Sequence, residues 1–399
     1  MVDNFQDLKF VRAADVHKGG VLAGHLVRTA RGGVNFSYTA EYLTSGLPAV
    51  ASSLPLADLP VETPAGALPS FFAGLLPEGH RLSVLRDATK TSLDDELTLL
   101  LAVGADAPGD VQVVPAGESP VEPAPLADTS RPEDLDFAAL ANSVDRHAIP
   151  GVQDKASASM LTTPLSLKGQ RYLLKLDPPN HAHLLANEAA HLSAAKDLKI
   201  PVAKSRIITD MHGLPGLLVE RFDRVRDKNR IWVRLPMEDG AQVMGLPPAS
   251  KYSVASEEVA SALAGMCKAP LVAIRNLYLQ FVFAWLTGNG DLHAKNLSIL
   301  GSEDGGFVMA PIYDIPCTLL YGDDSLALPV SGKTKNLKAK HWADFAASVG
   351  LPQRAADKAN ALALSASGKV SLEDLPFTGS PLRGALRELR FRRGELEAS

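Results

Sequence analysis

The most constraining feature of this sequence is the segment TGNGDLHAKNLSIL, residues 287–300, which joins a long apolar run to a dense group of polar side chains. The preceding run, LYLQFVFAWL, has helical character. The GNG sequence that follows cannot continue a helix without cost, so we expect a tight loop at the helix end. Any fold of this chain must therefore accommodate Asp291, His293 and Asn296 close together on that loop.

Two interpretations of this loop are open. Asp and Asn favour turns and a lone His is usually structural, so the segment could be a solvated turn. An Asp followed five residues later by an Asn is also the arrangement that phosphoryl transfer uses, with Asp291 accepting a hydroxyl proton and Asn296 holding Mg²⁺. Asp314, behind the strand-like run FVMAPIY, supplies the second metal-binding carboxylate. Transition-metal binding by Asp291 and His293 lacks the further His or Cys that would close a site.

The same chemistry requires groups that bind ATP. Lys175 lies inside the apolar strand YLLKLDPP, where a buried lysine needs a partner, and Glu188 on the following helix is a candidate. The segment AIPGVQDKAS offers a weak phosphate-loop signal at Gly151. The segment LVERFDR could present the backbone of Glu220 and Phe222 to an adenine edge. Together these features favour an ATP-dependent phosphotransferase.

The order of the secondary-structure signals predicts an α+β, two-lobed fold with its site in the cleft. Near the N-terminus, two strands are expected around the Gly32–Gly33 turn, then two leucine-rich helices, the second capped by Ser92, and a closing strand GDVQVVP. Five prolines from Pro115 to Pro132 mark a linker. Strands and one helix follow, and the chain after residue 250 is mostly helical. The expected domains are a β-rich N-terminal domain with linker (1–125), a kinase N-lobe-like domain (126–225) and an all-α C-terminal lobe (226–399).

Composition limits the classes of function. The net charge of -5 gives no global attraction to nucleic acid or anionic membrane, so direct DNA binding by this chain alone is disfavoured. Two distant cysteines cannot form a disulfide framework, which favours a reducing compartment. No signal peptide is recognisable and no apolar stretch approaches the length of a membrane span. We therefore expect a soluble, cytoplasmic protein with no membrane partner.

A series of motifs runs along nearly the whole chain, in the order LPLADLP, FFAGLLPEGHR, GVQDKASASM, YLLKLDPP, NEAAHLSAAKDLKIP, LLVERFDR, RLPMEDGAQVMGLPPASKY, GDLHAKNLSI and PIYDIP. This series resembles the motifs of the HipA-type toxin serine/threonine kinases. It implies the toxin of a bacterial toxin–antitoxin pair, which phosphorylates an aminoacyl-tRNA synthetase, often glutamyl-tRNA synthetase, stalls translation and promotes dormancy and persistence. It also implies a HipB-like helix-turn-helix antitoxin that carries the pair onto operator DNA as an autorepressor.

The same resemblance implies a set of roles for ATP and Mg²⁺ binding. Asp291 would be the catalytic base, and Asn296 with Asp314 would hold Mg²⁺. The remaining positions are Lys175 on the ATP phosphates, Glu220 and Phe222 at the adenine hinge, Gly151, Val152, Gln153 and Lys155 in the phosphate loop, His293 and Lys295 supporting the catalytic loop, and Glu238, Asp239 and Gln242 beside the site.

One position departs from the family pattern. Such kinases usually carry a serine three residues before the loop glycine, where autophosphorylation ejects the loop and switches the kinase off. Here Ala148 occupies this regulatory position and has no hydroxyl group, so this chain should lack that switch. The alanine is either natural or a Ser→Ala change.

Two other functions stay open. NGDLHAKN also resembles the catalytic loop of aminoglycoside and choline kinases, which phosphorylate small alcohols, although those enzymes do not usually carry LPMEDGAQ. A catalytically inert, antitoxin-binding scaffold is the other alternative. The basic segments 331–341 and 383–393 are most simply solvated faces, and one of them could help dock DNA or a tRNA-bound substrate.

Overall fold

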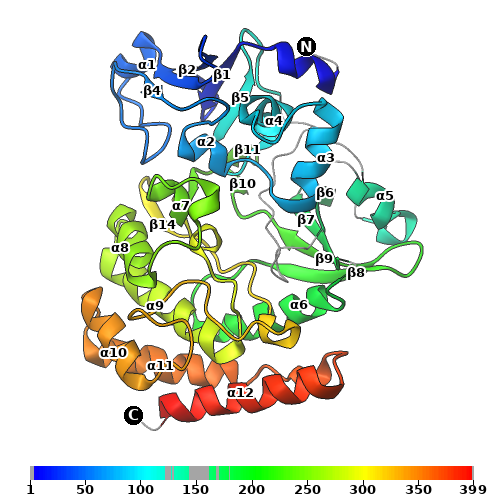
Figure 1. The fold of residues 1–399 in the computed structure, drawn as a ribbon, viewed down its shortest axis with the longest axis vertical. Coiled ribbons are helices and arrows are strands. Elements are labelled where there is room, and N and C mark those ends of the chain that lie inside the picture. The colour runs from blue at the N-terminus through cyan, green and yellow to red at the C-terminus, as the bar shows by residue number, and fades with distance from the viewer. Residues whose placement is uncertain are drawn as a thin grey trace.

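The computed structural model of the chain describes residues 4–121, 127, 130–142, 161–167, 170–178 and 180–397. Its N-terminal domain is built on an antiparallel sheet with strand order β4-β3-β2-β1-β5, at one end of the molecule in Figure 1. The strands are β1 (Ala13–Lys18), β2 (Val21–Arg28), β3 (Val34–Tyr38), β4 (Val61–Glu62) and β5 (Val111–Pro115). The predicted turn between β2 and β3 is confirmed: Gly32 has a φ of 83°, and Thr29 N–H donates to Gly33 O over 2.8 Å.

Short helices complete this domain: α1 (Ala40–Thr44), α2 (Ser70–Gly74), α3 (Gly79–Thr89) and α4 (Glu96–Val103). Their apolar side chains, including Phe72 and Leu99, form a core with the sheet. The predicted cap at Ser92 is wrong. Asp95 caps α4 by accepting the N–H of Thr98, whereas the Ser92 hydroxyl accepts the N–H of Asp94 in the preceding turn.

The middle of the chain forms the N-lobe, an antiparallel sheet with the order β6-β7-β9-β8. Its elements are α5 (Phe137–Asn142), β6 (Leu161–Leu167), β7 (Gln170–Leu176), α6 (Leu184–Ala195), β8 (Ser205–Thr209) and β9 (Pro215–Glu220), followed by the hairpin of β10 (Arg224–Arg226) and β11 (Trp232–Arg234). Phe137 packs on one face of the sheet, against Leu174 and Leu218. Leu217 and Val219 belong instead to the core shared with the C-terminal lobe.

The C-terminal lobe is arranged around α9 (Pro270–Thr287), in which every residue from Leu277 to Thr287 is buried. Its other helices are α7 (Gly240–Val243), α8 (Ser256–Met266), α10 (Ala339–Ser348), α11 (Gln353–Ser367) and α12 (Gly379–Glu397). The expectation of an all-α lobe requires one amendment, because β12 (Met237–Asp239), β13 (Ser298–Gly301) and β14 (Phe307–Met309) form a small antiparallel sheet. These strands are too short to show alternation in the sequence.

The two lobes share one apolar core, while the N-terminal domain has its own. Leu192 of α6 and Val219 of β9 belong to the same cluster as Leu277 and Phe281 of α9. This arrangement is the predicted α+β, two-lobed, kinase-like fold with an additional N-terminal domain (Figure 1). In the part of the chain that the structure describes, no helix has the length and apolar character needed to cross a membrane.

Candidate active site

The loop that carries Asp291 begins where α9 ends. Gly288 has a φ of 74°, a left-handed conformation that glycine adopts easily at a helix C-terminus. Its N–H bonds back to Trp285 O over 3.3 Å. A Cβ added to Gly290 would lie 2.4 Å from Ser325 O. The two glycines of the GNG sequence are therefore required for different reasons. Gly288 is required by its backbone conformation, and Gly290 by the close approach of another backbone segment.

Asp291 and Asn296 are fixed to each other and to their surroundings. Asn296 Nδ2 donates to the backbone oxygen of Asp291 over 2.9 Å. The O–H of Tyr252 donates to Asp291 Oδ1, also over 2.9 Å. Burial, reinforced by the Asp291 carboxylate, raises the pKa of Tyr252, so this phenol remains protonated and acts as a donor. The carboxylate of Asp291 is thus oriented by Tyr252, a residue to which the sequence patterns assigned no role.

Lys175 of β7 reaches two acidic side chains from other elements. Its Nζ donates to both oxygens of Glu188 on α6, over 2.8 and 2.9 Å, and to Asp314 Oδ1 over 3.1 Å. Burial acts to lower the pKa of Lys175, but the carboxylates of Asp314 and Glu188 outweigh it and raise that pKa above its usual value. The side chain is therefore a fixed, charged ammonium group beside the cavity, and Glu188 is the partner expected from the sequence.

Asn296 and Asp314 offer oxygen ligands to the same cavity. Asp314 has a φ of 56°, an uncommon conformation for a non-glycine residue that is often found at functional sites. Among the described residues, no group of three or more His, Cys, Asp and Glu side chains could hold a metal by itself. One amide and one carboxylate fit Mg²⁺, which is commonly held by one or two protein oxygens together with substrate phosphates and water.

A cavity of about 160 Å³ brings these groups together between the lobes and the N-terminal domain. It is lined by Lys175, His293, Lys295, Asn296 and Asp314, by the predicted hinge residues Glu220 and Phe222, by apolar residues such as Leu173, Val219 and Met237, and by Gly74, Leu75, Glu78 and Pro108 of the N-terminal domain. Apolar walls with a few convergent polar groups are typical of small-molecule sites. The contribution of the N-terminal domain was not predicted from the sequence.

The predicted hinge lies at the end of β9. The N–H of Glu220 donates to Lys204 O over 2.8 Å and is therefore already used. A nucleotide base that contacts this backbone position would bind the carbonyl oxygen of Glu220 instead. The ring of Phe222 packs against Tyr313 at a centroid distance of 5.7 Å. The O–H of Tyr313 in turn donates to Lys295 O over 2.7 Å. Hinge and catalytic loop are therefore connected through Tyr313.

Lys295 and His293 support the loop in different ways. The Nζ of Lys295 lies 3.0 Å from both Gly74 O and Glu78 Oε1, so this ammonium group is directed toward the N-terminal domain. His293 is buried, and its ring packs edge-on against Tyr252 at a centroid distance of 5.0 Å. Both residues line the cavity, as the predicted position of the site requires.

The MEDGAQ segment joins the C-terminal lobe to the N-terminal domain. Asp239 and Gln242 form a capping box at the start of α7, with Gln242 N–H donating to Asp239 Oδ1 over 2.8 Å. The side-chain amide of Gln242 donates to Phe71 O over 2.9 Å, and Glu238 accepts the Ser52 hydroxyl over 2.6 Å. These three residues, to which the sequence patterns assigned no specific role, thus connect the two parts of the chain, and Asp239 and Gln242 also line the cavity.

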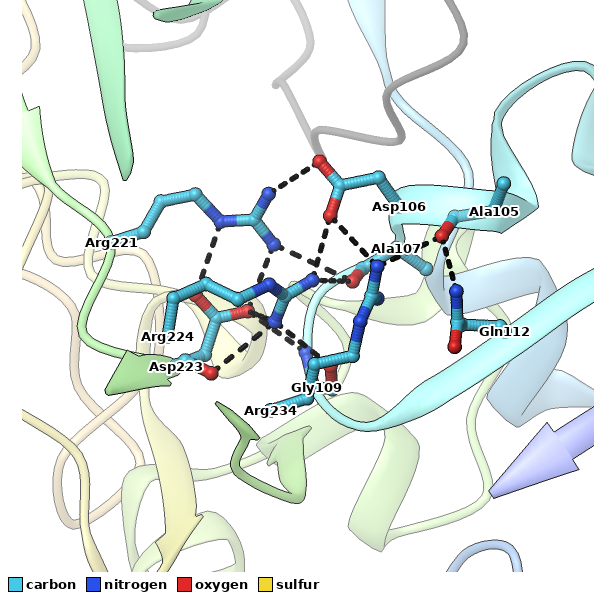
Figure 2. A network of polar contacts seen from close by, with 9 residues as sticks. All are labelled: Ala105, Asp106, Ala107, Gly109, Gln112, Arg221, Asp223, Arg224 and Arg234. Atoms are coloured by element: carbon cyan, nitrogen blue, oxygen red, sulfur yellow. Dashed lines mark hydrogen bonds and ion pairs between the residues drawn. The ribbon is translucent and has the colours of Figure 1, made fainter. Parts of the chain in front are cut away.

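A buried cluster of charges attaches the N-terminal domain to the chain just after the hinge (Figure 2). This arginine cluster consists of Asp106, Arg221, Asp223, Arg224 and Arg234. Asp106 accepts Arg221 Nη1 over 2.8 Å and Arg224 Nη2 over 2.7 Å, and Asp223 accepts further bonds from both arginines. Burial acts against ionisation of Asp223, but Arg221 and Arg224 prevail and lower its pKa.

Some predicted positions lie outside the described residues, namely Ala148, Gly151, Val152, Gln153 and Lys155. The C-terminal basic segment is not uniformly solvated. Arg392 is buried, with its guanidinium 3.7 Å from the ring centroid of Trp285 and a 3.1 Å bond to Trp285 O at the end of α9. By contrast, Arg383, Arg387 and Arg390 are exposed, as are Lys333, Lys335, Lys338 and Lys340 of the other basic segment.

A helical lobe and a sheet lobe, with an Asp–Asn loop, a paired lysine and a further aspartate meeting between them, define a kinase. The chain belongs to the HipA family of kinases. Residues 14–114 match the HipA N-terminal domain, and residues 147–368 match the HipA-like C-terminal domain.

Similar proteins agree with this assignment. Y4mE of Sinorhizobium fredii, named as a candidate kinase, is 30% identical over 86% of this chain and 87% of its own. The serine/threonine-protein kinase toxin HipA of Shewanella oneidensis is 25% identical over 85% of this chain and 84% of its own. A solved structure of HipA from Shewanella oneidensis, in complex with HipB and operator DNA, superposes with a TM-score of 0.75 at 21% identity, covering 96% of this chain and 97% of that one.

Proposed function

We propose that this chain is an ATP-dependent serine/threonine protein kinase and the toxin of a bacterial toxin–antitoxin pair. It would transfer the γ-phosphate of ATP to a serine of a translation protein, an aminoacyl-tRNA synthetase such as glutamyl-tRNA synthetase. Translation would stop, and the cell would enter growth arrest and persistence. The observation that supports this proposal most strongly is that Lys175, Asn296 and Asp314 line one cavity. Asp291 is tied to that group through its backbone oxygen, which accepts a hydrogen bond from Asn296 Nδ2.

The proposed mechanism follows from the positions of these groups. Asp291, held by Tyr252, would accept the proton of the attacking hydroxyl group. The hydroxyl oxygen would bond to the γ-phosphorus while the bond between that phosphorus and the leaving ADP oxygen breaks. Lys175 would bind phosphate oxygens. Asn296 and Asp314 would hold Mg²⁺, which when bound neutralises charge on the phosphates. Catalysis would consist mainly of positioning and electrostatic stabilisation.

The partner proposal rests on the relatives. The Shewanella oneidensis HipA structure contains HipB and operator DNA, so we propose that this chain binds a HipB-like helix-turn-helix antitoxin and reaches operator DNA mainly through it. The net charge of -5 is consistent with DNA contact that depends on a partner. We also propose a cytoplasmic location, because Cys267 and Cys317 are both free thiols, which favours a reducing compartment.

Transfer of labelled γ-phosphate from ATP and Mg²⁺ into a bacterial lysate tests the kinase proposal, with an Asp291→Asn variant as the matched control. We expect one labelled protein band that the variant does not produce, and its mass would identify the substrate. Label only in the small-molecule fraction would instead support an alcohol kinase. ATP binding without any transfer would support an inert, antitoxin-binding scaffold.

Ala148 leads to a separate proposal, that the chain does not switch itself off by autophosphorylation at this position. Incubation with ATP and Mg²⁺ should leave residues 143–160 without added phosphate in a mass-spectrometric peptide map. An Ala148→Ser variant should acquire one phosphate there and lose activity as it does so. A variant that gains no phosphate would contradict this regulatory assignment.

A further inference from the structure

Glu78 is an N-terminal-domain residue whose side chain enters the kinase site. It precedes α3 at the N-cap position, yet its carboxylate makes no capping bond there. The two carboxylate oxygens bind different lysines of the C-terminal lobe: Oε1 lies 3.0 Å from Lys295 Nζ, and Oε2 lies 2.5 Å from Lys251 Nζ. All three side chains are largely buried, with 11%, 5% and 1% of their surfaces exposed in the order Glu78, Lys295, Lys251. The carboxylate thus bridges two cations of another domain.

Both lysines are attached to the loop that carries Asp291. Lys295 belongs to that loop, and its ammonium group also donates to the backbone oxygen of Gly74, the last residue of α2. The backbone oxygen of Lys251 accepts the N–H of Ala294 over 3.2 Å. The next residue, Tyr252, donates to Asp291 Oδ1. Two separate connections therefore run from Glu78 to the catalytic loop, one of them ending on the carboxylate of Asp291.

The charge balance makes this bridge important for the loop. Two buried ammonium groups require anionic partners, because an unpaired buried charge is strongly destabilising. Glu78 supplies contacts below 3.1 Å to both lysines. Asp239 is the nearby second acid, and its Oδ2 lies 3.9 Å from Lys295 Nζ. Removing the Glu78 charge would leave Lys251 and Lys295 to reorient toward water, and the loop would move with them.

We propose that Glu78 is a positioning residue for Asp291, so that the N-terminal domain is a working part of the kinase site. This inference rests on the proposed function, because the consequence of the position is phosphoryl transfer. It assigns to the N-terminal domain a role in catalysis that is separate from any contact with an antitoxin or with DNA.

The test compares Glu78→Gln with Ser52→Ala in the full chain. Ser52 is the matched control because its hydroxyl also joins the N-terminal domain to the C-terminal lobe, through Glu238, without touching Lys251 or Lys295. We expect kcat to fall at least tenfold in Glu78→Gln, with KM for ATP changed by no more than about twofold. Ser52→Ala should keep both constants. An equal loss in both variants, or an unchanged kcat in Glu78→Gln, would overturn the proposal.

Amide hydrogen exchange provides a readout that needs no activity. Exchange in peptides covering residues 288–297 should rise in Glu78→Gln relative to peptides from β9, and should not rise in Ser52→Ala. If the wild-type chain transfers no phosphate but this local difference is present, the proposed function fails while the positioning inference holds. If exchange in residues 288–297 is the same in Glu78→Gln and Ser52→Ala, the inference is overturned whatever the activity of the chain.

A double variant combines Glu78→Gln with Lys251→Gln and distinguishes a positioning role of Glu78 from a purely stabilising one. It also keeps the inference testable if the single variant Glu78→Gln folds poorly. Removing one buried lysine restores the balance of charges, so the Tm should recover toward that of the wild type. The bridge to the loop remains broken, so kcat should stay low. Recovery of kcat together with Tm would show that Glu78 only stabilises the fold and would overturn the inference.

Discussion

Two buried groups of charges connect the N-terminal domain to the kinase lobes, and they differ in chemistry. The arginine cluster contains three arginines and two aspartates behind the hinge, joined by closely spaced hydrogen bonds (Figure 2). The second group, the lysine bridge, consists of Glu78, Lys251 and Lys295 at the catalytic loop. The guanidinium group binds through a rigid, planar fork, whereas the ammonium group is a point charge on a flexible stem. We infer that the arginine cluster sets the position of the N-terminal domain. The lysine bridge then transmits that position to the catalytic loop.

The carboxyl groups reflect this difference. In the arginine cluster the pKa of Asp223 is lowered, because Arg221 and Arg224 overcome the effect of burial. Beside the lysine bridge the pKa of Asp239 is raised, because burial prevails over the attraction of Lys295 and Glu78 adds a like charge. The arginines therefore prevail over burial at Asp223 of the arginine cluster, whereas burial prevails at Asp239 beside the lysine bridge.

Breaking the arginine cluster should give the largest loss of stability. Asp106→Asn leaves three arginines with one carboxylate partner fewer, and such a change at a buried site typically costs about 3–5 kcal/mol. Urea unfolding of the variant should report this loss. The exposed ion pair of Arg86 with Asp87 supplies the control, since Asp87→Asn should change the free energy of unfolding by no more than about 0.5 kcal/mol. Equal effects of the two changes would remove the distinction between a structural joint and an ordinary surface pair.

The connection from the lysine bridge to Asp291 is broken by Tyr252→Phe, which deletes the hydrogen bond to the carboxylate. Hydrogen bonds to charged groups contribute about 1.5–3 kcal/mol, so we expect kcat to fall roughly 10- to 160-fold. Tyr278→Phe is the control, because the O–H of the buried Tyr278 also donates to a side-chain oxygen, that of Asn360, which lies outside the catalytic loop. Steady-state kinetics with both variants checks the result. A similar kcat in Tyr252→Phe and wild type would mean that Asp291 needs no such orientation.

The catalytic loop illustrates what local sequence can predict. The apolar run before Thr287 fills the buried helix α9, and the glycines that follow end it because of conformation and close packing. Lys175 in an apolar strand demanded an acidic partner, and Glu188, only 13 residues away, is that partner. Such features depend on periodicity and on the cost of burying a charge, both of which are visible in a short window.

The arginine cluster and the lysine bridge could not be predicted from a short window of sequence. Glu78 and Lys251 are 173 residues apart, and Asp106 and Arg221 are 115 residues apart, so no local pattern connects them. The prediction of the α4 cap failed for a related reason. Ser92 and Asp95 are both good capping residues. Arg28, a distant residue on β2, favours Asp95 through a 2.6 Å ion pair. Arg392 looked solvated because its stacking partner, Trp285, lies 107 residues earlier in the chain.

The smallest expected effect concerns acid and distinguishes, by its sign, Asp223 of the arginine cluster from Asp239 beside the lysine bridge. Because the pKa of Asp223 is lowered in the folded state, its contribution to stability is complete above the ordinary value of 3.8 and is lost as the pH falls below it. Asp239, whose pKa is raised, has the opposite effect: the folded state binds its proton more tightly, so stability decreases as the pH rises through 3.8 toward the raised pKa. Urea unfolding between pH 3 and 6 should thus show a shallower acid loss in Asp223→Asn and a steeper one in Asp239→Asn, which retains a good cap for α7. Each slope should change by no more than about 1.4 kcal/mol per pH unit. Slopes that change with the same sign in both variants would mean that Asp223 and Asp239 are ionised against the same balance of burial and charge.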